Sequence, residues 1–373
     1  MVPRDVDVVV IGGGAMGLST AWWLAPRARV VVLERFEAGH HRGASHGDER
    51  IFRYLYADPT YVEMAVAADE GWQRLERDAG RPLFHRVGSI EHGTADGELS
   101  EMTQVAQQFG VATEVLTASD ATDRWPVMRV APGDTVLMQP SAGWVRAADA
   151  VESLAARATA GGADLRFGTR VSAIEVDDGG VRVRASDETY RASAVVLTAG
   201  AWTADLVPGV SLPPLTTTEE HVFFFRPDPK IARTAVPSFL HLHDRTIYGL
   251  PTPQGLVKLG EHHTGEITTG DDRTFAADPD RTARMERYVA TWLPGLVPQM
   301  VSTMTCLYTS TPSHDFVLDA VGPVVVGTGF SGHGFKFVPE IGRCLANLAL
   351  GEPPPHPRLT LEQHRQPRQR IRV

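Results

Sequence analysis

Lysine is almost missing from this sequence. Of the 36 basic residues in the 373-residue chain, 33 are arginine and only three, Lys230, Lys258 and Lys336, are lysine. Cysteine is equally scarce, with Cys306 and Cys344 alone. Two cysteines do not make a disulfide framework, and their scarcity is compatible with the reducing environment of the cytoplasm.

Long apolar runs and an excess of positive charge are missing as well. No uninterrupted apolar stretch approaches the roughly 18 residues of a transmembrane helix. Residues 1–5 lead directly into a predicted strand, without the charged and apolar regions of a signal peptide. The 45 acidic residues outnumber the 36 basic ones, for a net charge of −9, whereas broad nucleic-acid binding needs a basic surface. We expect a cytoplasmic protein with neither membrane nor nucleic acid as a partner.

The chain has enough length and apolar content for two cores. With 373 residues, 43% of them apolar, it is too long for one ordinary core. Buried strands are predicted at residues 7–11, 194–197 and 323–327, and an antiparallel pattern occupies residues 215–262 between the last two. This order predicts two interleaved domains rather than two consecutive ones. The first domain is predicted to comprise residues 1–85, 141–212 and 315–373, and the second residues 86–140 and 213–314.

A glycine motif near the N-terminus predicts a dinucleotide site. Gly12-x-Gly14-x-x-Gly17 follows the strand at 7–11 and opens a helix, and Glu34 closes the next strand. In such a motif the glycines permit a tight turn, a close approach of the backbone to a pyrophosphate and close helix packing. The helix N-terminus attracts the phosphates, and the acidic residue accepts hydrogen bonds from a ribose. The motif alone does not separate NAD from FAD.

A second glycine-rich junction lies near the C-terminus. Residues 328–336, Thr-Gly-Phe-Ser-Gly-His-Gly-Phe-Lys, follow a buried strand and open the last predicted helix. Backbone amides at such a junction can face an anion or a polarised ring. Two glycine-rich junctions at opposite ends of the chain suit a long cofactor that spans the sheet.

Three further segments resemble a known family. They are Gly-Ala-Ser-His-Gly-Asp-Glu-Arg-Ile-Phe-Arg at 43–53, Cys-Leu-Tyr at 306–308 and Gly-Phe-Ser-Gly-His-Gly-Phe-Lys-Phe at 329–337. The chain resembles the monomeric sarcosine oxidase and N-methyltryptophan oxidase family, within the glycine/D-amino-acid oxidase flavoproteins, from the glycine motif to about residue 350. The resemblance implies an α/β (α+β) protein. A Rossmann-like FAD-binding domain would interleave with a substrate domain built on a mostly antiparallel sheet with helices.

The resemblance also implies the roles of individual residues. The 8α-methyl group of FAD would be attached covalently to Cys306. Arg53 and Lys336 would bind the carboxylate of an amino acid. Lys258 would hold a water against flavin N5 and promote the reaction with oxygen, and His262 would lie near the substrate amine.

The walls of the substrate cavity follow from the same resemblance. Tyr248 and Tyr308 would line it, and Tyr56 would belong to the same wall. A slip of one residue would exchange His262 with His263.

Arg50 would act beside the flavin. Further contacts with the cofactor are expected from Gly12, Gly14, Met16, Gly17, Glu34, Arg35, Ser45, His46, Arg50, Val171, Gly200, Gly332, His333, Gly334 and Lys336, and no metal is expected.

Some positions depart from the family pattern. Glu261 stands where relatives often carry an aromatic residue, and residues 219–221, Glu-Glu-His, are unusually polar for a substrate domain. The Phe-Phe-Phe run at 223–225 is expected to enlarge or close an apolar wall of the substrate cavity. These positions leave the substrate open.

The predicted activity is oxidation of a secondary amino acid by an FAD-dependent oxidase. The C–N bond becomes an imine that hydrolyses, and O2 is reduced to H2O2. An N-methyl amino acid and an N-carboxymethyl amine with a large substituent fit equally well. Alternatives are a nicotinamide dehydrogenase, a flavin-dependent amino-acid dehydrogenase, or a flavin-binding subunit that passes electrons to another acceptor. We expect a monomer, with the Pro- and Arg-rich tail from Pro353 as a surface extension.

Overall fold

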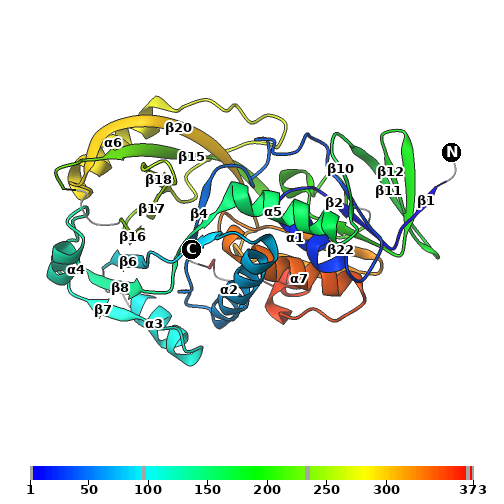
Figure 1. Ribbon diagram of the computed structural model, residues 1–373, viewed down its shortest axis with the longest axis horizontal. Coiled ribbons are helices and arrows are strands. Elements are labelled where there is room, and N and C mark those ends of the chain that lie inside the picture. The colour runs from blue at the N-terminus through cyan, green and yellow to red at the C-terminus, as the bar shows by residue number, and fades with distance from the viewer. Residues whose placement is uncertain (1–2, 95–97, 208, 232–235, 367–369, 372–373) are drawn as a thin grey trace.

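The computed structural model describes residues 3–94, 98–207, 209–231, 236–366, 370 and 371. It is elongated, with one large sheet in each half of its long axis (Figure 1). No helix in these ranges is long and apolar enough to cross a membrane.

A six-stranded sheet organises the half that contains the N-terminus. Its order is β10-β3-β2-β14-β22-β21, with five parallel strands and an antiparallel edge. Both faces of its central strands are covered, which explains their continuous valine runs. The strands are β2 (Val8–Ile11), β3 (Val30–Leu33), β10 (Asp164–Arg166), β14 (Ala194–Leu197), β21 (Val317–Val321) and β22 (Val324–Thr328).

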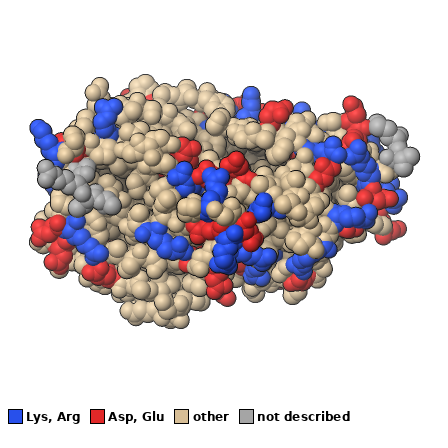
Figure 2. Space-filling view, viewed as in Figure 1, with Lys and Arg blue, Asp and Glu red and all other residues tan. Residues whose placement is uncertain are grey.

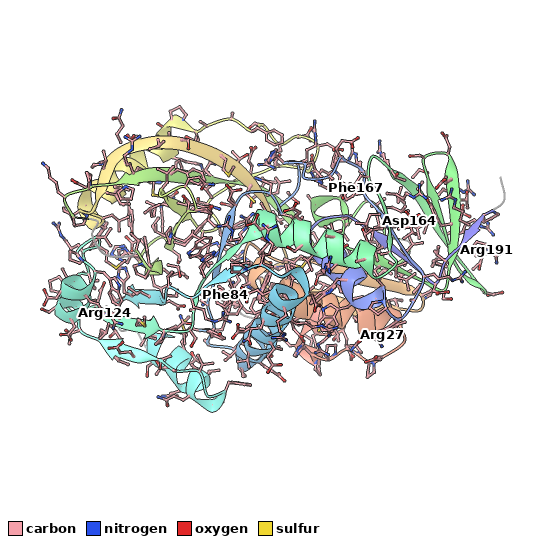
Figure 3. The ribbon with its side chains drawn as sticks, in the orientation of Figure 1. Arg27, Phe84, Arg124, Asp164, Phe167 and Arg191 are labelled. Atoms are coloured by element: carbon pink, nitrogen blue, oxygen red, sulfur yellow. The ribbon has the colours of Figure 1, made fainter. Side chains whose placement is uncertain are left out.

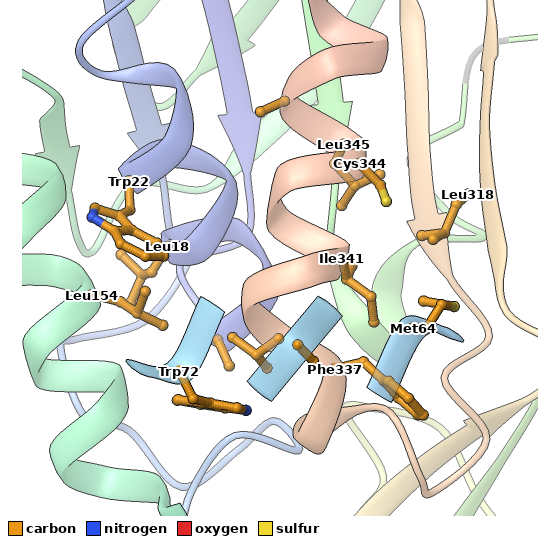
Figure 4. Packing of buried hydrophobic residues seen from close by; sticks show 14 of the residues in the cluster. Leu18, Trp22, Met64, Trp72, Leu154, Leu318, Phe337, Ile341, Cys344 and Leu345 are labelled. Carbon is orange, nitrogen blue, oxygen red and sulfur yellow. The ribbon is translucent and has the colours of Figure 1, made fainter. Parts of the chain in front are cut away.

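Alternate residues of each strand point to different cores. Val8 and Val10 join a cluster formed with helices, whereas Val9 and Ile11 join another with a smaller sheet. Figure 4 shows the helical side, where Trp22, Trp72 and Cys344 lie among apolar side chains. The helices are α1 (Ala15–Leu24), α2 (Pro59–Ala79), α5 (Ala147–Ala160) and α7 (Val338–Ala349). The smaller sheet, in the order β1-β13-β12-β11, comprises β1 (Arg4–Asp5), β11 (Val171–Asp177), β12 (Gly180–Ala185) and β13 (Glu188–Ala192).

A nine-stranded sheet organises the other half. The order is β19-β15-β18-β17-β16-β6-β8-β7, and β20 pairs with β15 to form the long curved ribbon of Figure 1. All of its pairs are antiparallel except β16 with β6. The strands are β6 (Ser89–Gly93), β7 (Glu114–Leu116), β8 (Thr135–Gln139), β15 (Thr216–Pro227), β16 (Ser238–Leu242), β17 (Ile247–Pro251), β18 (Val257–Glu261), β19 (Glu266–Ile267) and β20 (Leu296–Ser310).

Helices pack against both faces of this sheet, and a short sheet links the halves. Met285 and Val289 of α6 (Pro279–Trp292) and Ala121 of α4 (Ala118–Arg124) pack with the sheet in one apolar cluster, while α3 (Glu98–Gln108) contacts the sheet at β8. The linking sheet, in the order β4-β9-β5, consists of β4 (Glu49–Phe52), β9 (Gly143–Arg146) and β5 (Phe84–His85).

The interpretation of the tail is wrong. Leu359 and Leu361 are buried, and Arg358 pairs with Asp315 at 2.8 Å. The backbone N–H of Ile371 donates to Ser313 O at 2.9 Å. The tail therefore packs against the fold through η3 (Pro357–Leu359), η4 (Gln363–Arg365) and Ile371, because its scattered leucines and isoleucine provide apolar anchors among the polar residues.

Most of the charge lies on the surface in mixed patches. Basic and acidic side chains lie side by side on the face shown in Figure 2. Arg27, Arg124 and Arg191, on different elements in Figure 3, are all exposed, and Arg27 and Arg124 pair with Glu352 and Glu114. Exposed pairs of this kind contribute little to stability.

Candidate active site

A cavity of about 100 Å³, here called the inner cavity, lies among the chain segments that carry most of the predicted site residues. It is lined by side chains from β4, β15, β17, β18, β20 and η2 (Phe335–Phe337). Its lining joins segments that are far apart in the chain. The predicted site residues that line it are His46, Arg50, Arg53, Tyr248, Lys258, His262, Cys306, Tyr308, Gly332, His333 and Lys336.

Lys258 points into this cavity from the middle of β18. Its neighbours Val257 and Leu259 belong to the apolar cluster on the opposite face, which settles the orientation that alternation alone leaves open. Lys258 is 4% exposed, and its Nζ lies 3.2 Å from Glu49 Oε1. Burial and the nearby Arg50 lower the pKa of Lys258, and Glu49 opposes that shift.

Lys336 projects from η2 and is held by a buried hydrogen-bond network. Its Nζ donates to Tyr56 Oη at 2.9 Å and to His333 O at 2.8 Å. Tyr56 Oη also lies 3.1 Å from His333 Nδ1. Tyr56 therefore lies behind Lys336 and does not line the cavity itself. Burial, with the charge of Arg53, holds the pKa of Lys336 well below its ordinary value.

Arg53 follows β4, and one nitrogen of its guanidinium has no hydrogen-bond partner among the described residues. It is 2% exposed, its Nη1 donates to Leu55 O, and the same nitrogen lies 3.3 Å from Glu91 Oε1. Its guanidinium lies over the ring of Tyr56. The nitrogen without a partner in that part of the chain is Nη2. An N–H group left over in this way is available to a carboxylate.

The two cysteines have different surroundings. Cys306 on β20 is partly exposed and lines the inner cavity, with its Sγ 3.9 Å from Ala44 O. Cys344 is fully buried in α7, and burial raises the pKa of its thiol. Only Cys306 is placed to meet a ligand in the cavity.

Arg273 is a buried neighbour of Cys306 that sequence reasoning missed. It donates to Thr305 O, to Thr305 Oγ1 at 3.0 Å and to His41 O at 2.7 Å, and it lies 3.2 Å from His46 Nε2. Burial, with the charges of Arg50 and Arg273, lowers the pKa of His46 to about 3. Arg273 ties the loop before β4 to the strand that carries Cys306.

Aromatic rings form the wall between the inner cavity and its entrance. The His262 ring contacts those of Tyr248 and Tyr308, with centroids 5.7 and 5.5 Å away. Burial, His263 and Lys336 hold the pKa of His262 well below its ordinary value. His262 lines the inner cavity and His263 does not, which favours His262 in the predicted role.

A larger cavity of about 610 Å³, here called the outer cavity, adjoins the inner one. The two share Arg53, Leu240 and His262. The rest of its lining is mainly polar and comprises Glu91, Thr94, Met102, Leu242, His243, Asp244, Thr246, His263, His314, Arg370 and Ile371.

The glycine motif is packed as a dinucleotide site requires. Gly12 has φ +102°, and a Cβ on Gly17 would lie 1.9 Å from Gly12 O. Gly14, which precedes α1, provides no side-chain cap, and the first turn of α1 has no acidic residue, which leaves its N–H groups beyond Ala15 open to phosphates. Glu34 accepts from Gly13 N at 2.7 Å. Burial opposes ionisation of Glu34, but hydrogen bonds from His40, Phe36 and Gly13 keep its pKa below the ordinary value. These features fit FAD.

The other predicted cofactor contacts lie on several elements around the glycine motif and η2. Ser45 Oγ accepts from Ala15 N at 3.0 Å, beside the glycine motif. Met16 and Gly334 are close, because a Cβ on Gly334 would lie 3.2 Å from Met16 Cε. Arg35 directly follows Glu34 and pairs with Asp271 at 2.9 Å. Val171 begins β11 two residues after Thr169, whose N–H donates to Glu34 O at 2.7 Å. Gly200, with φ +56°, begins η1 (Gly200–Trp202) and follows Ala199, whose Cα would lie 3.1 Å from a Cβ on Gly12.

One expectation about the substrate wall is wrong. Phe223 and Phe225 are buried in the apolar cluster against α6, and Phe224 also lies outside the described lining of both cavities. Because side chains alternate along a strand, the rings of Phe223 and Phe225 point away from the site. Glu261 binds Arg284 at 2.5 and 2.6 Å, so its carboxylate serves that ion pair.

The polar residues at 219–221 anchor a loop rather than a substrate. Glu219 accepts from Thr274 N and Phe275 N, both at 2.9 Å. Glu220, which also lines the inner cavity, accepts from Thr264 N at 3.1 Å and Gly265 N at 2.8 Å. His221 Nε2 lies 3.1 Å from Ala276 O.

Known proteins resemble the whole chain. Residues 7–348 match the family of FAD-dependent oxidoreductases described as DAO. The chain is 30% identical to monomeric sarcosine oxidase from Bacillus sp. (strain NS-129), over 92% of each chain. It is 33% identical to peroxisomal sarcosine oxidase from Homo sapiens, also over 92% of each. N-methyl-L-tryptophan oxidase from Yersinia pestis (strain Pestoides F) is 30% identical, over 94% of this chain and 96% of that one.

A solved structure agrees with these sequences. NikD, an unusual amino acid oxidase essential for nikkomycin biosynthesis, superposes with a TM-score of 0.83 and 28% identity over 99% of this chain and 98% of that one. With the glycine motif, the packing around it and the match over residues 7–348, the resemblance inferred from the sequence is confirmed. The chain belongs to the DAO family of FAD-dependent oxidoreductases.

Proposed function

We propose that this protein is an FAD-dependent oxidase of a secondary amino acid, with O2 as the electron acceptor. The observation that carries the proposal is the set of three buried cations, Arg53, Lys258 and Lys336, around one small cavity. Burying cations without full pairing is costly, so such a cluster is characteristic of a site that binds an anion or stabilises developing negative charge.

Arg53 and Lys336 form the carboxylate site in this proposal. The free Nη2 of Arg53 and the ammonium of Lys336 supply separate donors. Holding the carboxylate there fixes the position of the neighbouring C–N bond, and such positioning lowers the entropic part of the barrier.

His262 acts on the substrate amine. Its depressed pKa keeps the imidazole neutral near pH 7, so a ring nitrogen can accept a hydrogen bond from the amine. The cations around the cavity disfavour a second positive charge, which lowers the pKa of the bound amine. Both effects favour the neutral amine, the form that can be oxidised.

When bound, FAD would supply the acceptor for two electrons and a proton from the substrate, and their transfer with a second proton to O2 would give an imine and H2O2. Lys258 supplies a fixed positive charge where negative charge develops on oxygen, and its buried position strengthens that effect. The imine then hydrolyses to an amine and an aldehyde or keto acid.

Cys306 is the proposed attachment point of the flavin. It is the one of the two cysteines that lines the inner cavity. After denaturation in acid, yellow colour should stay with the wild-type chain and be released by Cys306→Ser. Release from both would remove the covalent bond from the proposal and leave FAD binding intact.

The outer cavity favours the larger of the two substrate types. An N-methyl group would leave its roughly 610 Å³ unused, whereas a large N-substituent could extend past Arg53 and His262 into it. The relatives named after sarcosine and N-methyltryptophan support the shared amino-acid part of the substrate.

A peroxide-coupled screen tests the function. The purified, flavin-loaded chain is supplied with N-methyl and N-carboxymethyl amino acids of increasing size, and H2O2 is measured beside flavin bleaching without oxygen. Peroxide with a secondary amino acid supports the proposal. Rapid bleaching without peroxide, and turnover only with an artificial acceptor, would assign a dehydrogenase or an electron-transfer subunit instead. We also propose a cytoplasmic monomer, which sedimentation and fractionation check.

A further inference from the structure

A second cluster of chemistry-bearing side chains lies away from both cavities. His92 is on β6, His241 is on β16, and Asp134 immediately precedes β8. Leu240 and Leu242 line the outer cavity, so His241 between them points to the opposite face of the sheet. There it contacts α6, with its ring centroid 4.9 Å from that of Trp292.

The two histidines are adjacent because of the strand register. His241 is the direct partner of His92 in the parallel pair β16–β6, so both side chains lie on one face. Their rings stack with centroids 4.3 Å apart, and the residues are 2% and 1% exposed. Both imidazoles are therefore almost completely removed from water.

Each histidine has a nitrogen that the fold leaves unused. His92 Nδ1 and His241 Nε2 have no hydrogen-bond partner among the described residues. An unpaired buried nitrogen costs free energy. Burial lowers the pKa of His92 to about 4 and is the main cause that lowers that of His241 to about 3. The unpartnered nitrogen of each ring is therefore available to a ligand.

We propose that His92, His241 and Asp134 bind one divalent transition-metal ion of the zinc class. One ligand atom from each residue lies within 4.8 Å of the other two. His92 Nδ1 and Asp134 Oδ2 are 3.7 Å apart, too far for a hydrogen bond and close to the roughly 3.4 Å between ligands that bind zinc tetrahedrally at about 2.1 Å. Two imidazoles and a carboxylate are a ligand set that zinc uses in proteins.

The surroundings of His241 support the assignment. Its Nδ1 is 3.0 Å from Tyr288 Oη on α6, which orients the ring and leaves Nε2 for the ion. Metal-binding histidines commonly use their second nitrogen in this way. Binding tilts the two rings out of their parallel stack so that both lone pairs meet at one point, and a water completes the coordination beside Asp134, whose side chain is 7% exposed.

A comparable group elsewhere also has a buried histidine nitrogen without a hydrogen-bond partner in the described part of the chain, His356 Nε2, but its carboxylate is already paired. Glu340, Cys344 and His356 also lie close together, but Arg343 binds the Glu340 carboxylate at 2.7 and 2.8 Å. That cation already neutralises the carboxylate and repels a metal ion. His356 therefore provides a matched control.

Zinc binding to the flavin-loaded protein, stripped by a chelator, tests the proposal. Calorimetry with ZnCl2 should show one equivalent per chain for wild type and for His356→Gln, at least 100-fold weaker binding for Asp134→Asn and His241→Gln, and about 10- to 100-fold weaker binding for Tyr288→Phe. The thermal midpoint should rise with zinc in wild type and stay constant in Asp134→Asn.

Asp134→Asn keeps the volume of the side chain, which is 7% exposed, so its fold should persist, and flavin absorbance checks this. The proposal would be overturned if the wild-type protein did not bind one equivalent of zinc. It would also be overturned if Asp134→Asn and His241→Gln bound zinc as tightly as the wild type. Neither outcome depends on the oxidase activity.

Discussion

The inner and outer cavities share three side chains but differ in chemistry. The inner cavity is small, and its buried cations Arg53, Lys258 and Lys336 are held by Glu91, Glu49 and Tyr56. The outer cavity is about six times larger, with volumes of about 610 and 100 Å³. Its imidazoles His262, His263 and His314 stack in a row with centroids 4.7 and 4.1 Å apart.

This difference separates reaction from selection. A fixed charge acts strongly in a small, dry space, where water cannot screen it. Neutral rings and hydroxyls in a wide space discriminate between substrates by shape and hydrogen bonds, each with a modest effect. Changes in the inner cavity should therefore affect every substrate, and changes in the outer cavity only those that reach it.

The largest effect is expected at Lys258. Lys258→Met keeps the length and removes the charge, and it should slow the reaction of the reduced enzyme with O2 by about 10²- to 10³-fold, the usual magnitude for loss of one electrostatic stabiliser. Stopped-flow absorbance measures this step separately from anaerobic reduction by substrate. Equal slowing of both steps would contradict a specific role with oxygen. The exposed Lys230→Met is the control.

The next largest effect is expected at Arg53. Arg53→Lys keeps the charge and removes the fork, so the affinity for amino acids and for simple carboxylate inhibitors should fall about 10- to 100-fold. Inhibition constants measure the change. A loss confined to large substrates would move Arg53 from the carboxylate site to the outer cavity.

Outer-cavity variants should distinguish substrates by size. His314 has φ +62°, so His314→Asn tolerates the backbone and removes the ring that stacks on His263. We expect kcat/KM to fall about 10-fold for a large N-substituted substrate and to stay unchanged for the N-methyl analogue. Equal loss for both would show that the two cavities do not act separately.

The smallest effect is a difference in pH dependence. The pKa of Lys336 is held well below the ordinary lysine value of about 10.4. Affinity for a carboxylate inhibitor without an amine should therefore fall, as pH rises through this lowered pKa, before ordinary lysines titrate. The pKa of His263 is lowered to about 3, so size selectivity should stay constant between about pH 6 and 9. Inhibition and selectivity measured over that range test both statements.

Local patterns made most of the fold predictable. The valine runs of β2 and β14 and the spacing of Gly12, Gly14 and Gly17 are short-range signals with direct physical causes, and the structure contains the predicted strands and turn. The family resemblance implied roles for Cys306 and Lys258 that composition alone does not indicate.

Features formed by distant segments were not predictable. Arg273 is one arginine among 33, and its partners His41, His46 and Thr305 lie in two other parts of the chain. The prediction that Phe223–Phe225 form a wall of the substrate cavity was wrong, because alternation gives the period of a strand but not the face that meets the cavity. The His92–His241 pair depends on a parallel register that the sequence does not show.

The position of β14 has a consequence for how the protein is made. β14 lies between β2 and β22, and β22 comprises residues 324–328 of 373. A ribosome must therefore release nearly the whole chain before the central strand of this sheet gains its second neighbour. Until then the nascent chain exposes an unpaired valine-rich edge, which is a hazard for aggregation and a natural target for chaperones.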